Sequence, residues 1–480
     1  MPAKERYRHQ AVIVGGGLTG LALALMLQMH NIDYVLLESY GTVTPDVGAS
    51  IGLFPNGLRI LDQLGLYEEL LLQSMPVEKT VIRDGVSGRR ITTRPLKEVL
   101  AQRHGYPAMF TQRHQLLCLL HRHVQEKDRV HVNRKVTRVD TLDNSAVVYC
   151  HDGSVFEGQI VIGADGVRST IRKEMWRNAD ANNDGATIPA RDRAPVPCEF
   201  ACVFGTAKAT PGLAPGETVN ASANGVMAGL MSGHGGDVFL FSFWTMPEPQ
   251  RRYALDNIPR FGDEDMRREL GRSSDFIVAD NGMRLRDVIK SLDSSGVTAL
   301  PHYVMRRWHY GRIIIIGDSA HKYNPFAGQG GNSCLESCAA LVNALQDQGF
   351  EGGNQAWELS KLSKAFASVE TERVNRLVTM VEQAQDAIRI SSCGTWKSRL
   401  FTKYILPLLP LSIAMKTTSE QISGGVCLNA FPRPSVTHDW PYADDPPTQQ
   451  QRKPMRATIM VTTLPIVAFM AFLLSKTFGE

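Results

Sequence analysis

A glycine-rich turn near the start of the chain restricts the fold more than any other feature. An apolar run at residues 11–14 leads into GGGLTG at residues 15–20, an apolar helix is expected over residues 18–30, and a second strand at residues 34–38. Parallel strands need a crossover connection, which is usually a helix. The pattern therefore predicts a βαβ unit and an α/β protein built on a parallel sheet.

The three spaced glycines of this turn have separate uses. Gly15 permits the tight turn, Gly17 lets the backbone approach a pyrophosphate, and Gly20 lets helix and strand pack closely. The helix start offers unpaired N–H groups to an anion. Glu38 closes the second strand, where a carboxylate can accept hydrogen bonds from a ribose diol. These positions predict a dinucleotide site, and a purely structural glycine turn is the alternative.

Strand-like runs followed by glycine turns recur far along the chain. Residues 159–162 enter GADG, and residues 312–316 enter GDSAH. Together with the first turn, they predict one sheet assembled from separated segments. Between about residues 195 and 285 the pattern changes to β-like runs, and VFLFSFW places Phe239, Phe241 and Phe243 on one face of a strand. This stripe predicts either a wall of a substrate site or plain core in a β-rich lobe.

Composition excludes several classes of function. A length of 480 residues suits two or three lobes. The 52 Lys and Arg residues nearly balance the 48 Asp and Glu residues, so no nucleic-acid partner is expected. The eight Cys residues form no paired CxxC or His-containing zinc pattern, so no metal site is expected. We expect these cysteines to be reduced thiols.

The two ends of the chain differ. The N-terminus is charged and leads directly into the first strand, so no signal peptide is expected. Residues 457–475 carry no charged side chain and follow a basic cluster, which predicts a C-terminal transmembrane helix with the body on the cytosolic face of the endoplasmic reticulum. A buried C-terminal helix is the alternative. For YILPLLPLSIAM at residues 404–415, an interfacial and a core location both stay open.

Three motifs in order carry a family resemblance. With GADGVRS at residues 163–169, GDSAH at 317–321 and GQGGN at 328–332, the sequence resembles the class A FAD-dependent monooxygenases of the para-hydroxybenzoate hydroxylase type over roughly residues 10–345. The resemblance implies an α/β fold with a discontinuous Rossmann-like FAD-binding domain, a β-rich substrate lobe and C-terminal helices. The expected parts are residues 1–180 and 291–350 for the FAD-binding domain, 181–290 for the substrate lobe, 351–430 for the helices, 431–456 for a linker and 457–475 for the membrane segment.

The resemblance also implies roles for individual residues. Asp318 would bond the ribityl chain of FAD, and Gly328 to Asn332 would form a helix-start loop facing the flavin pyrimidine, whose negative charge in the reduced state a helix N-terminus stabilises. Arg113 in FTQRHQLL would reach the cofactor; a solvated helix arginine is the alternative. The cofactor-binding residues predicted in all are Gly15, Gly17, Gly20, Glu38, Gly52, Arg113, Asp165, Asp318, Pro325, Gly328, Gly330, Gly331 and Asn332.

No catalytic side chain is assigned from the sequence. His321 directly follows the GD turn, where a cap or packing role is at least as reasonable. The strand at residues 200–205 corresponds to a family strand in which an arginine is proposed to be catalytic, and here Ala201 occupies the corresponding place. A catalytic arginine in this lobe is therefore in doubt.

Within the class, the chain most resembles the fungal FAD-dependent epoxidases of meroterpenoid and indole-diterpene pathways. VIVGGGLTGLALALML, IGLFPNGLRILDQLGLYEEL and GDSAHKYNPFAGQGGNSCLES carry this likeness. It implies tightly bound FAD, NADPH or NADH as a transient reductant, O2, and a lipophilic farnesyl or geranylgeranyl substrate whose terminal alkene is epoxidised, with a membrane and a downstream terpene cyclase as partners. The alternatives are an aromatic ring hydroxylase, a prenyl-chain reductase and a prenyl-binding escort protein without enzymatic activity.

Overall fold

The computed structural model describes residues 6–46, 50–208, 212–247, 251–353 and 355–445. The chain divides into two units, Met1–Ala443 and Asp444–Glu480. The helices and strands described all lie in the first unit.

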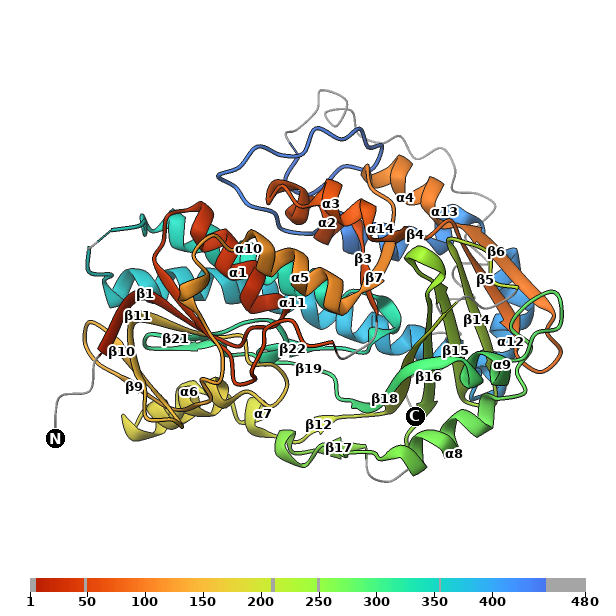
Figure 1. Cartoon of the computed structure of the whole chain (residues 1–480), viewed down its shortest axis with the longest axis horizontal. Helices are drawn as coiled ribbons and strands as arrows, with labels where there is room; N and C mark the ends of the chain where they lie inside the picture. Colours follow the sequence, from red (N-terminus) through yellow and green to blue (C-terminus); the bar gives the residue numbers. More distant parts are fainter. Residues whose placement is uncertain (1–5, 47–49, 209–211, 248–250, 354, 446–480) are drawn as a thin grey trace, which may run out of the picture. The chain divides into compact units, whose positions relative to one another are not determined.

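A mainly parallel sheet lies in the left part of Figure 1. Strand β1 (Arg6–Val14) pairs in parallel with β2 (Tyr34–Leu37) on one side and with β11 (Val155–Gly163) on the other, and β11 pairs in parallel with β21 (Ile313–Ile315). The strand order is β20-β21-β11-β1-β2-β8. The prediction of one sheet assembled from separated segments is confirmed. The remaining strands of this sheet are β8 (Val130–His131), β9 (Val136–Thr141), β10 (Ala146–Cys150) and β20 (His309–Tyr310).

Helices cover this sheet. The expected helix after the glycine turn is α1 (Leu18–Met29), and its residues from Leu18 to Leu27 are all buried. It packs against α5 (Arg113–His123) and α10 (Gly330–Asp347), and α10 packs in turn against the long helix α11 (Leu359–Ser391). Helix α6 (Thr170–Ala181) packs against β9, and its N-cap is Ser169, whose side chain accepts a hydrogen bond from the Arg172 N–H.

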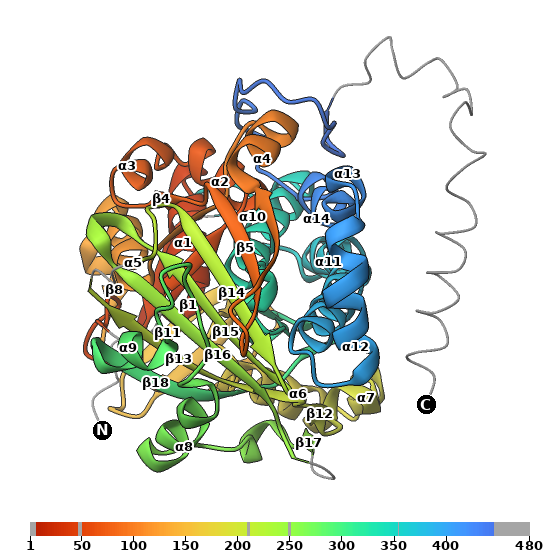
Figure 2. The same ribbon diagram turned by 90° about the vertical axis from the view of Figure 1, so that its right-hand side faces the viewer.

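A second, seven-stranded sheet carries the β-rich part of the chain (Figure 2). Its order is β18-β13-β16-β15-β14-β5-β6, antiparallel except for the β14–β5 pair. These strands are β5 (Lys79–Asp84), β6 (Arg90–Pro95), β13 (Phe200–Ala207), β14 (Glu217–Ala223), β15 (Val226–Ser232), β16 (Val238–Thr245) and β18 (Leu292–Leu300). The sheet thus takes β5, β6 and β18 from outside residues 181–290. One face packs against α8 (Asp263–Ser273) and α9 (Leu285–Lys290).

Short elements join the two sheets. A three-stranded sheet, β3-β7-β4, lies next to helix α2. Its strands are β3 (Ser50–Leu53), β4 (Met75–Pro76) and β7 (Met109–Gln112), and two small ladders are formed by β12 (Val196–Pro197) with β17 (Arg252–Tyr253) and by β19 (Tyr303–Val304) with β22 (His321–Lys322). The other α-helices are α2 (Pro55–Gln63), α3 (Tyr67–Leu72), α4 (Leu96–His104), α7 (Ala190–Arg193), α12 (Trp396–Leu400), α13 (Leu411–Ala414) and α14 (Lys416–Ser423).

The prediction of a transmembrane helix needs correction. Within residues 6–445, apart from the short gaps, no helix is both long enough and apolar enough to cross a bilayer. Helices α10 and α11 have the length, but α10 carries Glu336 and Asn343 in its interior and α11 carries charged residues along its whole course. The predicted segment, residues 457–475, lies outside the described residues. The single-pass membrane location that was built on this helix is not retained.

Replacing Gly20 with alanine tests the close approach of α1 to the glycine turn. A Cβ atom at position 20 would lie 1.9 Å from the carbonyl oxygen of Gly15, so the helix would have to move away. We expect Gly20→Ala to lower the free energy of unfolding by roughly 1–3 kcal/mol, measured by urea denaturation. Gly271→Ala is the matched control, because Gly271 also lies in a helix but its Cβ would meet no atom within 4 Å. That variant should gain about 0.5–1 kcal/mol, and equal losses at both sites would contradict the packing.

Candidate functional site

One large cavity of about 1340 Å³ extends from the glycine turn of the parallel sheet to the inner face of the seven-stranded sheet. Residues 14–19 and 37–43 line one end. Met227, Met231, Phe241 and Phe243 line the other. The predicted site residues that line this cavity are Gly15, Gly17, Glu38, Gly52, Arg113, Asp165, Asp318, Pro325, Gly328, Gly330 and Gly331. The structure therefore brings together eleven of the thirteen, and Gly20 and Asn332 lie behind the lining.

The glycine turn leaves space beside an arginine. Gly15 adopts φ +108°, and a Cβ atom there would lie 2.4 Å from the Ala164 carbonyl oxygen, so only glycine suits this position. Gly17 is the N-cap of α1 and faces the cavity. A Cβ atom at Gly17 would lie 3.7 Å from Nη2 of Arg113. The start of α1 and the Arg113 guanidinium thus face the same part of the cavity, where both favour an anion.

Glu38 fixes the turn while it lines the cavity. Its Oε2 accepts a hydrogen bond of 2.6 Å from the Gly16 N–H. Its Oε1 accepts hydrogen bonds from the Tyr40 N–H at 2.9 Å and the Ser39 hydroxyl at 3.0 Å. The carboxylate is buried, so these contacts replace lost hydration and hold the end of β2 against the glycine turn.

Arg113 has no partner among the described residues. No hydrogen bond or ion pair joins its guanidinium to any of them, although it begins α5 at the edge of the cavity. Burial lowers the pKa of Arg113, and the carboxylates of Asp318 and Glu38 partly oppose that effect. A half-buried guanidinium without a protein partner is stabilised by an anionic ligand, because its own desolvation is otherwise uncompensated.

Asp318 lies in the 3-10 turn Gly317–Ser319 that follows β21. Its carboxylate forms an ion pair with the ammonium group of Lys322. Burial lowers the pKa of Lys322, but the attraction of Asp318 outweighs it and raises the pKa overall. The Cys334 thiol, whose pKa burial raises to about 12, lies 4.0 Å from Oδ1 of Asp318. Asp318 therefore presents a carboxylate to the cavity between a cation and a neutral thiol.

Asp165 of the GADG turn binds protein groups. Its Oδ1 accepts hydrogen bonds from the hydroxyls of Ser169 at 2.5 Å and Ser319 at 3.1 Å. Its Oδ2 accepts one of 3.0 Å from the Ile171 N–H at the start of α6. The side chain therefore ties α6 to the GD turn across 154 residues of sequence.

The turn from Pro325 to Gly331 forms the middle of the cavity wall. Gly328 adopts φ +65° after the 3-10 turn Pro325–Ala327, and α10 begins at Gly330. A Cβ atom at Gly330 would meet no atom within 4 Å, whereas at Gly331 it would lie 2.5 Å from Cδ1 of Ile51. The first N–H groups of α10 have no partner within the helix, so this wall offers hydrogen-bond donors to a ligand.

Asn332 fixes this turn from behind. Its Oδ1 accepts a hydrogen bond of 2.9 Å from the Phe54 N–H, and its Nδ2 donates to the carbonyl oxygens of Gly52 at 3.1 Å and Gly328 at 2.8 Å. Gly52 therefore reaches the cavity wall as part of β3, which this side chain joins to α10. The sequence motif placed Asn332 among ligand contacts; in the structure all three of these hydrogen bonds go to the protein backbone.

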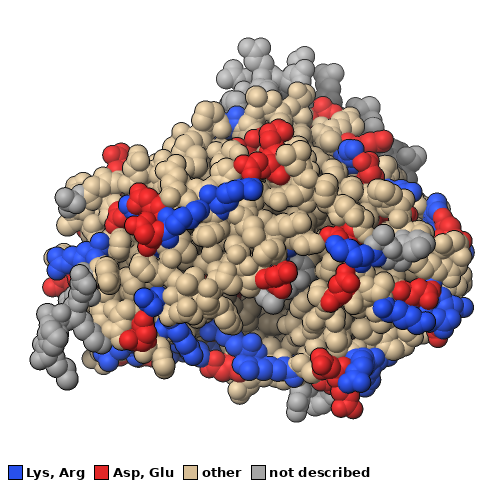
Figure 3. Space-filling view, in the orientation of Figure 1, with Lys and Arg blue, Asp and Glu red and all other residues tan. Residues whose placement is uncertain are grey.

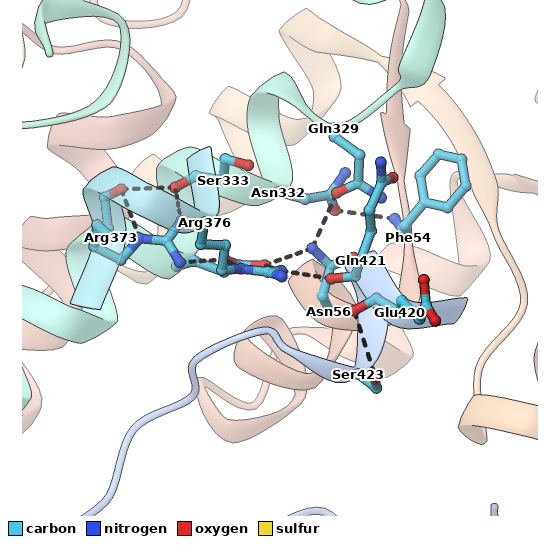
Figure 4. A network of polar contacts seen from close by, with 12 residues as sticks. Phe54, Asn56, Gln329, Asn332, Ser333, Arg373, Arg376, Glu420, Gln421 and Ser423 are labelled. Carbon is cyan, nitrogen blue, oxygen red and sulfur yellow. Dashed lines mark hydrogen bonds and ion pairs between the residues drawn. The ribbon is translucent and has the colours of Figure 1, made fainter. Parts of the chain in front are cut away.

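A buried ion-pair network supports the same turn (Figure 4). Glu336 of α10 is fully buried and pairs with Arg373 at 2.5 Å and with Arg376 at 2.9 Å, both from α11. Its Oε1 also accepts a 2.6 Å hydrogen bond from Nδ2 of Asn56, which donates a second one of 3.0 Å to Gln329. Burial alone would raise the pKa of Glu336, but the two arginines outweigh burial and lower the pKa to about 2.

The far end of the cavity is apolar. Phe241 and Phe243 stack with their ring centres 6.2 Å apart, and Phe326 meets Phe243 edge to face at 6.2 Å. Phe239, the third member of the predicted stripe, is buried on the same face of the sheet but does not line the cavity. The polar side chains on this wall are those of Thr80, Thr218, Asn220 and Thr298.

His321 and the position of Ala201, where the family resemblance suggested an arginine, both face away from the cavity. His321 is fully buried; burial lowers its pKa to about 3, and its ring stacks on Trp308 and contacts the Ser337 hydroxyl at 3.0 Å. Ala201 belongs to the core layer that packs against α8 and α9. A longer side chain at position 201 would therefore point to the outer face of the sheet.

Comparison with known proteins defines the class to which this site belongs. A family model described as an FAD binding domain matches residues 8–185 and 283–355, more than half of the chain. All three glycine turns lie inside the matched residues. The protein is a flavoprotein, and its cofactor is FAD.

Individual relatives narrow the class. The chain is similar to the FAD-dependent monooxygenase nvfK of Aspergillus novofumigatus, with 34% identity over 433 residues that cover 90% of each chain. It is also similar to the FAD-dependent monooxygenase atmM of Aspergillus flavus, with 32% identity over 474 residues, 97% of this chain and 95% of the relative. The chain therefore belongs to the family of FAD-dependent monooxygenases. Its fold is similar to that of Klebsiella pneumoniae HpxO complexed with FAD and uric acid (TM-score 0.71, 21% identity, covering 87% of this chain and 97% of HpxO).

The residues of the cavity fit FAD. The start of α1 and Arg113 suit the pyrophosphate, since both attract anions and Arg113 has no described protein partner. Lys322, Asn56 and the Glu336 network were not expected from the sequence. Glu336 could have been noticed as a charged residue within the apolar run CLESCAALV, but its partners are 37 and 40 residues away and only the fold brings them together.

Removing the charge of Arg113 should weaken FAD binding without lowering the stability of the apoprotein. We expect Arg113→Met to weaken FAD binding roughly 10- to 100-fold, because a hydrogen bond to a charged group contributes about 1.5–3 kcal/mol. The apoprotein of this variant should be as stable as the wild-type apoprotein or slightly more stable, because the substitution removes an unpaired charge from a half-buried position. FAD affinity is measured by fluorescence titration and stability by the melting temperature of the apoprotein. Unchanged affinity would contradict the assignment.

The Glu336 network predicts a pH dependence. Because the pKa of Glu336 is about 2 in the folded chain against an ordinary 4.5, its stabilising effect is complete above pH 4.5 and is lost as the pH falls towards 2. Glu336→Gln should lower the free energy of unfolding at pH 7 by about 3–5 kcal/mol, because it leaves buried arginines unpaired. In urea titrations, the difference in the free energy of unfolding between this variant and the wild type should become smaller as the pH falls below 4.5. Glu420→Gln, which removes an exposed pair with Lys416, should cost less than about 1 kcal/mol at every pH.

Proposed function

We propose that this FAD-dependent monooxygenase epoxidises a terminal alkene of a farnesyl or geranylgeranyl intermediate in a fungal meroterpenoid or terpenoid pathway. The observation that carries the proposal is the apolar end of the cavity, where Met227, Met231, Phe241 and Phe243 face the turn from Pro325 to Gly331. A prenyl chain has no polar atoms, so walls of this kind can bind it and exclude water. The resemblance to prenyl epoxidases supports the same choice.

The chain's own residues would position the two reactants. Arg113 and the start of α1 would hold the FAD pyrophosphate, Asp318 the ribityl hydroxyls, and the N–H groups at the start of α10 the pyrimidine edge. When bound and reduced, FAD supplies the activation of O2 and the transfer of one oxygen atom. Phe243 and Phe326 would place the alkene next to Pro325, so orientation and exclusion of water are the main contributions of the protein. NADPH or NADH is the proposed transient reductant.

The polar groups of the apolar wall suit the other end of the substrate. Thr218, Asn220 and Thr298 can hydrogen-bond a neutral oxygen-bearing head group without placing a charge in the cavity. The epoxide product is activated by protonation of its oxygen, which makes it a substrate for an acid-initiated terpene cyclase. A cyclase is therefore the proposed downstream partner.

Isotope labelling tests the reaction. Purified holoenzyme is given NADPH, a farnesylated phenol and oxygen-18 gas, and the products are analysed by mass spectrometry with fragmentation. We expect one labelled oxygen on the terminal isoprene unit. The same assay with NADH in place of NADPH identifies the preferred reductant.

Two results would contradict epoxidation. A label on the aromatic ring would make the protein a ring hydroxylase, and a product with two added hydrogens and no label would make it a prenyl-chain reductase. The position of the label, rather than its presence alone, therefore decides the activity.

A further inference from the structure

The segment after α11 exposes large apolar side chains along one face. Helix α12 (Trp396–Leu400) continues into a π-helical turn, Phe401–Ile405, and a 3-10 turn, Leu406–Leu408, with right-handed helical backbone at the junctions. Trp396, Leu400, Tyr404 and Leu408 are 68%, 50%, 55% and 80% exposed. Residues four apart lie on the same side of an α-helix or π-helical turn, so Trp396, Leu400 and Tyr404 share one side, and Leu408 is exposed at the end of the segment. These four residues are here called the apolar ridge.

The opposite face of this segment is buried and polar. Ser398 and Thr402, also four apart, are 8% and 4% exposed, and Ser398 forms a capping box with Thr395. A helix on a protein surface normally buries its large apolar residues and exposes its polar ones. Here the arrangement is reversed. The segment lies alongside α11, at the right-hand margin of the first unit in Figure 2.

Cationic side chains border the apolar ridge. Lys397, Arg399 and Lys403 are exposed, and the ammonium groups of Lys397 and Lys403 lie 6.0 and 5.4 Å from the ring centres of Trp396 and Tyr404. The sequence from residue 387 to residue 419 contains no Asp or Glu. The face shown in Figure 3 differs, because there cationic and anionic side chains are interspersed. Asp84 of β5 is an anionic neighbour, because Lys403 contributes to lowering its pKa. The apolar ridge therefore combines exposed apolar surface with three cationic side chains and one neighbouring carboxylate.

We propose that the apolar ridge docks on the surface of an anionic lipid bilayer. Leu400 and Leu408 would enter the boundary between headgroups and acyl chains, and Trp396 and Tyr404 would lie at headgroup depth, where rings with a polar edge are favoured. Lysine and arginine side chains keep their charges at the lipid phosphates while their stems cover apolar surface. The docking is peripheral, and no residue of the apolar ridge crosses the bilayer.

The charge pattern favours a lipid surface over a protein partner. A protein interface of this composition needs a matching acidic and apolar surface, whereas an anionic bilayer offers both properties at any position. Aromatic rings paired with lysines along a short amphipathic segment are typical of interfacial helices. The inference concerns a surface outside the cavity, so it is tested without substrate and does not depend on the epoxidation.

Flotation of vesicles with the full-length holoprotein tests the apolar part. The vesicles contain phosphatidylcholine with about one third phosphatidylserine. We expect the double variant Leu400→Ser, Leu408→Ser to bind at least about tenfold more weakly, because two apolar insertions are lost. The matched control is Leu72→Ser, Leu142→Ser, at positions 77% and 50% exposed elsewhere on the surface, and it should bind as the wild type does. Both variants should keep their FAD content and melting temperature.

Charge reversal tests the electrostatic part. The triple variant Lys397→Glu, Arg399→Glu, Lys403→Glu should lose roughly a hundredfold in binding to the same vesicles, at about 1 kcal/mol per cationic residue. Wild-type binding should weaken with added salt. Brominated lipids should quench the tryptophan emission of the wild type, and Trp396→Phe should remove that quenching.

Three outcomes would overturn the proposal. The first is vesicle binding by the serine variant that equals that of the wild type. The second is equal binding of the wild type to uncharged phosphatidylcholine vesicles. The third is a concentration-dependent dimer that the serine variant abolishes while no vesicle binding is seen, which would assign the apolar ridge to an interface between copies of this chain.

Discussion

A buried charge between three helices holds the cavity together. Glu336 has no contact with water, so its carboxylate is stable in the folded chain only because Arg373, Arg376 and Asn56 surround it. Those partners come from α11 and α2. Asn56 also donates a hydrogen bond to the side chain of Gln329 at the start of α10 and so fixes that residue as well. The turn whose N–H groups face the cavity is therefore fixed by electrostatics behind it. A buried pair of this kind contributes less to net stability than to the selection of one arrangement over others.

The two ends of the cavity have opposite physical character, and the two sheets explain why. The parallel sheet ends in glycine turns and helix starts, which bring backbone N–H groups, Arg113 and Lys322 to one end. The inner face of the second sheet repeats apolar side chains every second residue, which gives the other end its phenylalanines and methionines. A ligand with a charged part can therefore occupy one end and an uncharged molecule the other, and the turn at Gly328 separates them.

Local patterns in the sequence predicted the frame of the site. The spacing of Gly15, Gly17 and Gly20 identified the first βαβ unit. The alternation of phenylalanines placed Phe239, Phe241 and Phe243 on one face of β16 and left open whether they form a wall or core; Phe241 and Phe243 line the cavity and Phe239 does not. Sequence could not supply partners that only folding brings together, such as Glu336 with Arg373, nor show that Asn332 binds backbone groups. Ala201 illustrates a further limit: adjacent strand residues point to opposite faces, so a shift of one position in an unaligned comparison moves a side chain out of the cavity. Hydropathy of the C-terminal segment predicted a spanning helix that the described residues do not contain.

The order of strands in the parallel sheet affects how the chain can fold while it is being synthesised on the ribosome. Strand β1 lies between β2 and β11, and β11 must also pair with β21, which begins at Ile313, about 300 residues after the end of β1. At about 5–20 residues per second, a ribosome needs roughly 15–60 s to add those residues. Throughout that time α1 lacks α10, its main helical neighbour, and β11, once it is made, has a free edge until β21 follows about 150 residues later. The nascent chain thus exposes the apolar helix α1 for far longer than a hairpin needs to form, so this topology benefits from protection during synthesis.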